Sequence, residues 1–186
     1  MAHEMAIYRL DPDNDRFHNF ALADESDAAI YHRFNGTPLG DEWKSLEIMA
    51  VDTDDELAQL GDHALLGTIP VFSERAIASL ADTLKANGEA LPLVYSRQPY
   101  FAFNVTSVVD ALDEGLSKLQ RFSSGRVMSI DEFVFRPESV RGRSIFKIPQ
   151  LPRAFVFVTD DFVDRVRAAG LQGFDFHEVW RHEVRV

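Results

Sequence analysis

Short apolar runs, separated by turn residues, form the main pattern of this chain. Alternation of apolar and polar residues, or clustering of β-branched and aromatic residues, favours strands. Pro92 cannot donate a backbone hydrogen bond, so its run is expected at the edge of a sheet. The pattern predicts strands over residues 5–10, 46–51, 91–95, 100–105, 127–135, 145–148, 155–158 and 174–180.

Apolar residues at helical spacing occupy fewer stretches. Ser73 is a suitable N-cap for a helix that ends before Gly88. A short helix is expected over 108–112, and Asp160 is expected to cap another helix that ends at Gly170. Strands outnumber helices, and several neighbouring strands have no helix between them. The sequence therefore predicts an α+β fold, with a largely antiparallel or mixed sheet, a few short helices and an acidic N-terminal region packed on it.

Negative charge is concentrated in the first third of the chain. Residues 1–62 carry fifteen Asp and Glu against four Lys and Arg, whereas residues 63–186 carry fifteen of each. This difference predicts two parts, an acidic region over 1–62 and an α+β domain over 63–186. An acidic surface attracts basic partners and repels nucleic acid and anionic membranes. Solubility alone would also account for such a surface.

The composition narrows the class of protein. The 186 residues include no cysteine, which excludes disulfides and thiolate chemistry and fits a reducing cytoplasm. The first residues have neither the basic start nor the apolar run of a signal peptide, and no apolar run reaches the roughly 18 residues of a transmembrane helix. We expect a cytoplasmic protein that does not bind a membrane.

The sequence lacks the common motifs of cofactor and nucleophile chemistry. It contains neither a glycine-rich phosphate loop nor a Gly-x-Ser-x-Gly turn. Asp11, Asp13 and Asp15 have the alternate spacing of a calcium loop, but Arg16 stands where such a loop needs glycine. We therefore predict no cofactor and no metal site.

One acidic cluster in the balanced part of the chain leaves an enzymatic function open. It consists of Asp110, Asp113 and Glu114. These carboxylates could cap a helix at a solvated end, or they could serve a small enzyme in acid–base catalysis. A deep cleft with strongly shifted pKa values would favour the enzyme, and a shallow, solvent-facing setting would favour the caps.

One basic cluster bears on nucleic-acid binding. It consists of Arg136, Arg141, Arg143 and Lys147, and a solvated hairpin explains it as well as phosphate binding does. The net charge of −11 also disfavours a nucleic-acid partner.

The order of elements from residue 69 to residue 180 resembles a known family, the immunity proteins of bacterial polymorphic-toxin systems with the eleven-type immunity domain. The resemblance is carried by Tyr100, Ser117 and the segments 89–93, 104–105, 108–113, 145–148, 158–162, 170–174 and 179–180. It implies a non-enzymatic protein that binds and neutralises a cognate toxin in competition between bacteria. We interpret four residues as defining the fold, with Asp110 as a helix cap: Gly173, Phe146, Trp180 and Asp110.

The acidic region lies outside this resemblance, so it is where specificity for one toxin could reside. Many toxin domains act on nucleic acid and present basic clefts, which an acidic patch would complement. The predicted toxin-binding residues are Asp24, Glu25, Asp27, Asp52, Asp54, Asp55 and Glu56. The oligomeric state is left open.

Overall fold

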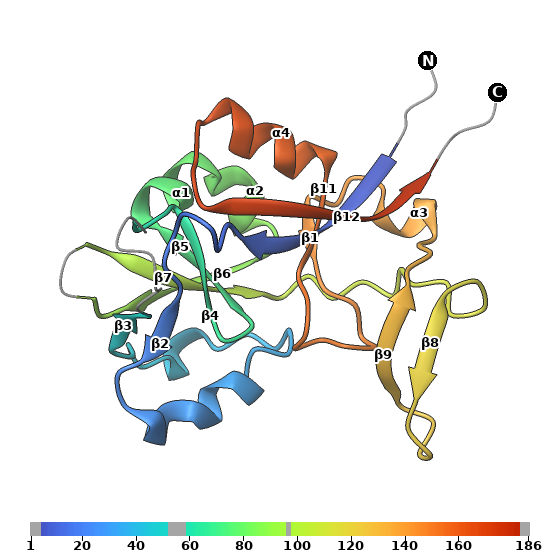
Figure 1. Ribbon diagram of the computed structural model, residues 1–186, viewed down its shortest axis with the longest axis horizontal. Helices are drawn as coiled ribbons and strands as arrows, with labels where there is room; N and C mark the ends of the chain where they lie inside the picture. Colours follow the sequence, from blue (N-terminus) through green and yellow to red (C-terminus); the bar gives the residue numbers. More distant parts are fainter. Residues whose placement is uncertain (1–4, 52–58, 96–97, 183–186) are drawn as a thin grey trace.

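The computed structural model describes residues 5–51, 59–95 and 98–182, which form two main sheets and one separate hairpin. Figure 1 shows the helices α1, α2 and α4 on one side of the molecule and the 3₁₀ helix η1 on the other. The mixture of sheets and short helices confirms the predicted α+β class.

The smaller main sheet has four strands in the order β10-β11-β1-β12, and all of its pairs are antiparallel. Its central strand β1 pairs on one side with β11 and on the other with β12. Buried Ile7, for example, lies opposite Thr159 and Trp180. The acidic N-terminal region thus contributes a strand to the middle of this sheet. The strands are β1 (Met5–Pro12), β10 (Ile145–Phe146), β11 (Phe157–Thr159) and β12 (Phe174–His182).

The larger sheet has six strands in the order β3-β2-β4-β5-β7-β6, and only its β2–β4 pair is parallel. The strand that contains Pro92 lies at the edge, as predicted. The strands are β2 (Phe20–Leu22), β3 (Ile48–Ala50), β4 (His63–Leu66), β5 (Ile69–Ser73), β6 (Gly88–Leu93) and β7 (Tyr100–Val105).

The predicted helix after Ser73 is present as two short helices, α1 (Glu74–Ser79) and α2 (Ala81–Lys85). The Ser73 hydroxyl accepts a hydrogen bond from the Ala76 amide at 3.1 Å, which confirms Ser73 as the N-cap. α3 (Pro137–Val140) is a single turn, and α4 (Asp160–Ala168) buries Phe162, Val163 and Val166. The remaining elements are η1 (Glu25–His32), η2 (Gly40–Glu42), β8 (Lys118–Arg121) and β9 (Val127–Glu132).

Asp160 has a different role from the one predicted. Thr159 is the N-cap of α4, and Asp160 is its first helical residue. The Asp160 carboxylate accepts hydrogen bonds from the Ala6 amide at 2.8 Å and from the Tyr8 hydroxyl at 3.1 Å. These bonds connect α4 to β1 rather than closing the end of the helix.

The predicted helix over 108–112 is wrong. This segment is extended, and Val108 pairs with Lys147 while Leu112 pairs with Phe135 in isolated bridges. β-branched Val108 and Val109 fit extended pairing better than a helix. Consequently Asp110 caps no helix, and its carboxylate instead lies 3.1 Å from the Arg136 guanidinium.

The predicted solvated hairpin over the basic cluster is also wrong. Arg136 and Arg141 flank the single turn of α3, and Lys147 is only 4% exposed. The strand predicted over 127–135 ends at Glu132, because the chain then turns inward and buries Phe135. These corrections all come from long-range packing that local spacing does not encode.

The core contains a completely buried histidine, His63. The His63 ring stacks on Phe174 at 4.9 Å between centroids, and neither ring nitrogen has a hydrogen-bond partner among the described residues. Burial lowers the pKa of His63 to about 3, so the ring is neutral at physiological pH. His63 therefore acts as an aromatic core residue.

Candidate functional site

The described part of the predicted acidic site lies at the start of η1. Asp24 is the N-cap of this 3₁₀ helix, and its carboxylate accepts a hydrogen bond from the Ser26 amide at 2.9 Å. This bond lowers the pKa of Asp24. Glu25 and Asp27 follow in the first turn, and all three acidic side chains are exposed. We call Asp24, Glu25 and Asp27 the acidic turn; Asp52, Asp54, Asp55 and Glu56 lie outside the described residues.

Three polar side chains hold the backbone that follows η1. The Lys147 ammonium donates to the Phe34 carbonyl at 2.6 Å, and the Asn104 amide donates to the Thr37 carbonyl at 2.9 Å. The Glu89 carboxylate accepts from the amides of residues 39 and 40 at 2.8 and 3.0 Å. Asn104 also donates to Glu89 at 3.0 Å. We call Glu89, Asn104 and Lys147 the loop anchor, because together they fix residues 34–40 on the sheet.

Burial and hydrogen bonding shift the pKa values of the two charged residues of the loop anchor, Lys147 and Glu89. Burial lowers the pKa of Lys147 to about 8, since in the described chain this ammonium has a carbonyl partner but no carboxylate. Partial burial raises the pKa of Glu89, but the hydrogen bonds from Leu39, Asn104 and Gly40 outweigh it and hold the pKa below its usual value. Leaving the buried Lys147 ammonium or the Glu89 carboxylate without its hydrogen-bond partners would be energetically costly, so residues 34–40 have a defined position.

Gly36 lets the anchored loop lie against the extended segment 106–110. Its φ is +100°, in the left-handed region that favours glycine. A Cβ at this position would lie 2.2 Å from Cγ2 of Val108. The close approach therefore depends on the missing side chain.

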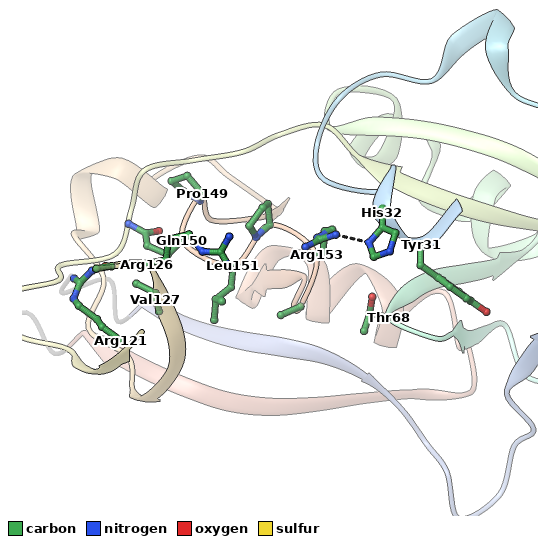
Figure 2. A pocket seen from close by; sticks show the side chains of 13 residues that line it. Tyr31, His32, Thr68, Arg121, Arg126, Val127, Pro149, Gln150, Leu151 and Arg153 are labelled. Atoms are coloured by element: carbon green, nitrogen blue, oxygen red, sulfur yellow. Dashed lines mark hydrogen bonds between the residues drawn. The ribbon is translucent and has the colours of Figure 1, made fainter. Parts of the chain in front are cut away.

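A cavity with a volume of about 690 Å³ lies at the other end of η1. Figure 2 shows that segments distant in sequence line it: Tyr31 and His32 of η1, Thr68 of the β4–β5 turn, the β8–β9 hairpin and the loop 149–154. The hairpin contributes Arg121 and Arg126, and the loop contributes Arg153. We call this cavity the basic groove, since no Asp or Glu is among its described lining residues.

The arginines of the basic groove differ in their partners. Arg121 forms an ion pair with Glu114 at 2.6 Å, and Glu114 also accepts from the Gln150 amide at 2.8 Å. The hydrogen bond from Gln150 has the largest effect on the Glu114 carboxyl, followed by the one from Arg121, and both lower its pKa. Arg126 lies over the Phe122 ring at 5.6 Å, and Arg153 contacts the His32 ring. In the described chain neither Arg126 nor Arg153 has a carboxylate partner.

The acidic cluster suggested for catalysis has a structural setting. Asp110 is exposed in its ion pair with Arg136. Asp113 accepts from the amides of Gly115 and Leu116 at 3.0 and 3.1 Å, which makes it the cap of a turn. Glu114 is the partner of Arg121. These contacts favour the capping interpretation over acid–base catalysis.

Acidic side chains near the N-terminus are likewise engaged with arginine. Asp11 accepts from Arg9 at 2.7 Å, and Asp13 accepts from Arg16 at 2.8 Å. Within the described ranges, no three His, Asp or Glu side chains are grouped so that they could hold a metal ion. Asp11 and Asp13 therefore form local ion pairs.

The comparison with known proteins finds a match that covers the hairpin and the loop of the basic groove, together with Asn104 and Lys147 of the loop anchor. Residues 95–181 match the Immunity protein family (Imm11). This match confirms the resemblance found in the sequence. No curated protein matches the chain. Among the described residues, no helix is both long and apolar enough to cross a membrane.

The Imm11 match contains Asn104, Lys147 and the groove arginines, whereas the acidic turn lies before it. Sequence reasoning brought the acidic turn together but did not identify the loop anchor or the basic groove. One signal was present, since Lys147 interrupts an apolar run within a segment that carried the resemblance. Its partner, the Phe34 carbonyl, could only be identified from the structure.

Proposed function

We propose that this chain is a cytoplasmic immunity protein of a bacterial polymorphic-toxin system, which binds its cognate toxin and neutralises it without catalysis. The match of residues 95–181 to the immunity protein family carries this proposal. Binding would occlude the active site or the substrate channel of the toxin. No cofactor is required for such an inhibitor.

The acidic turn is proposed as one contact with the toxin, together with Asp52, Asp54, Asp55 and Glu56. Its side chains are exposed, and η1 is held in place through the loop that follows it. A fixed acidic surface would steer a basic active-site cleft toward the inhibitor and compete with an anionic substrate.

Co-expression with a candidate toxin domain, sought in the adjacent reading frame, tests the proposed function. The wild-type chain should restore growth of cells that express this domain, and the two purified proteins should form a complex. Growth arrest despite normal levels of the folded chain, with no complex, would contradict the proposal.

Charge reversal tests the contribution of the acidic turn. The variant Glu25→Lys/Asp27→Lys keeps the Asp24 cap and should slow association with the toxin by about tenfold at low salt, because it removes electrostatic steering. Asp82→Lys/Asp164→Lys is the matched control, since it makes the same change of charge on exposed positions of α2 and α4. An equal effect of both variants would contradict a specific role of the acidic turn.

A further inference from the structure

The basic groove has the features of a protein-binding surface. In Figure 2 Arg121 and Arg126 lie toward one end of the cavity, and Arg153 lies toward the other, next to His32. Leu151 and Pro149 lie between these charged ends and provide apolar lining, and Pro152 of the same loop also lines the cavity. Arginine beside apolar and aromatic groups is the composition typical of binding hot spots.

The groove continues onto an exposed hairpin. β8 and β9 form a separate two-stranded sheet, and its turn carries Phe122, which is 46% exposed under Arg126. This exposed aromatic ring, stacked under an arginine that lines the cavity, extends the apolar lining formed by the 149–152 loop.

We propose that the basic groove binds an acidic segment of the toxin that also carries apolar side chains. Carboxylates of this segment would pair with Arg126 and Arg153, and its apolar side chains would cover the 149–152 loop and Phe122. This inference rests on the proposed function and adds a second contact, of opposite charge to the acidic turn.

The guanidinium groups fit carboxylates in particular. An Arg side chain can donate two parallel hydrogen bonds to one carboxylate, which gives geometric specificity as well as attraction. Arg121 already has Glu114 as its partner, whereas Arg126 and Arg153 have no carboxylate partner in the described chain. Arg126 and Arg153 are thus the positions where a partner's carboxylates would be bound.

A protein segment fits the groove better than a nucleic acid. The chain as a whole has a net charge of −11, and the acidic turn lies on the same 3₁₀ helix that lines the groove. A polyphosphate backbone longer than the groove would extend onto the acidic turn and be repelled there, while a short acidic segment would meet only the groove.

The test measures binding to the toxin domain from the adjacent reading frame by surface plasmon resonance. Arg126→Glu/Arg153→Glu should weaken binding by about a hundredfold or more, mainly through faster dissociation, because like charges then face each other in a partly desolvated contact. The control Arg141→Glu/Arg143→Glu makes the same charge change at exposed positions outside the groove and should bind within a few-fold of wild type.

A second arm identifies the partner group. Replacing single Asp or Glu residues of the toxin domain by Arg should yield one variant that binds Arg126→Glu/Arg153→Glu better than it binds the wild-type chain. Labelled single-stranded RNA should bind neither form of the chain.

The outcomes separate this inference from the proposed function. If the wild-type chain binds the toxin and the groove variant binds equally well, the groove assignment is overturned while the proposed function stands. If the wild-type chain does not bind the toxin, both are overturned. If the wild-type chain binds RNA and the groove variant does not, the ligand of the groove is a nucleic acid and not an acidic protein segment, and the inference is overturned.

Discussion

The acidic turn and the basic groove lie at opposite ends of the same eight-residue 3₁₀ helix, η1. At a rise of about 2 Å per residue, the two ends are separated by about 14–16 Å. This exceeds the Debye length of about 8 Å at physiological ionic strength, so the opposite charges do not cancel each other. One face of the molecule can therefore present two contacts of opposite sign to one partner.

The two surfaces also differ in how they are built. The acidic turn is formed by three residues within four positions of the chain. The basic groove is assembled from η1, a β-turn, a hairpin and a loop that are distant in sequence. The loop anchor connects them, because Lys147, just before the groove loop 149–154, holds the backbone directly after η1.

The largest stability effect is expected from Gly36→Ala. It places a Cβ 2.2 Å from Val108 Cγ2 at a positive φ, so it should lower the free energy of unfolding by about 2–5 kcal/mol. Both surfaces should weaken together, since both depend on the position of η1. Urea denaturation measures the first effect and toxin binding the second.

Gly142→Ala is the control for backbone strain alone. Its φ is +75° and no atom lies within 4 Å of an added Cβ, so the cost should be about 1–2 kcal/mol. Val108→Ala should recover the difference in the Gly36→Ala background. Equal losses in Gly36→Ala and Gly142→Ala would mean that the contact with Val108 is not needed.

The next effect concerns the buried charge of Lys147. Its folded pKa of about 8 lies below the unfolded value of about 10.4, so the unfolded state binds more protons between these values. Stability should therefore rise with pH in this window, by at most about 1.4 kcal/mol per pH unit, and this gain is lost as pH falls through 8.

Lys147→Met keeps the apolar length of the side chain and should abolish this pH dependence, because it removes the group that titrates. Lys85→Met, at an exposed position on α2, should retain the wild-type dependence. Thermal unfolding at pH 7 to 10 provides the measurement. A slope that persists in Lys147→Met would assign it to another group.

A smaller effect is expected from Glu89→Gln. The carboxamide keeps one acceptor oxygen and places an NH₂ group where the other carboxylate oxygen was. With the NH₂ group facing the amide of residue 40, one of three hydrogen bonds to this side chain would be replaced by repulsion, at a cost of about 1–2 kcal/mol. Limited proteolysis should then cut first within 34–42. Cleavage that begins elsewhere would mean that Glu89 does not hold this loop in place.

The smallest effect is expected from salt. Raising the ionic strength should slow toxin association of the wild-type chain and of the groove variant by similar factors, because the proposed function assigns electrostatic steering to the acidic turn. The variant Glu25→Lys/Asp27→Lys should show a flatter dependence. If the groove variant instead lost the salt dependence, the roles of the two surfaces would be exchanged.

Local signals in the sequence were sufficient for several elements. Alternation predicted β12, aromatic clustering predicted β7, and the Ser73 cap was correct. The acidic turn was also predictable, because its residues are neighbours in the chain. The division of the chain at residue 62 stays a prediction, although β1 lies in the sheet of β11 and β12.

The rest depended on contacts between distant residues. Residues 108–112 carry helix-like spacing, yet bridges to Lys147 and Phe135 hold them extended. The loop anchor needs backbone partners that lie up to 113 positions away in sequence. The groove arginines lie far apart in the sequence, on the hairpin and on the 149–154 loop, and form no motif, so no local pattern distinguished them from other surface charges.

Hydrogen–deuterium exchange of the chain, free and bound to the adjacent-frame toxin domain, tests the central claim most directly. The account predicts slower exchange in the complex at residues 25–32, 121–127 and 149–154, on the face of Figure 1 that carries η1 and the hairpin. Protection confined to α1, α2 and α4, with unchanged exchange in those three segments, would contradict it.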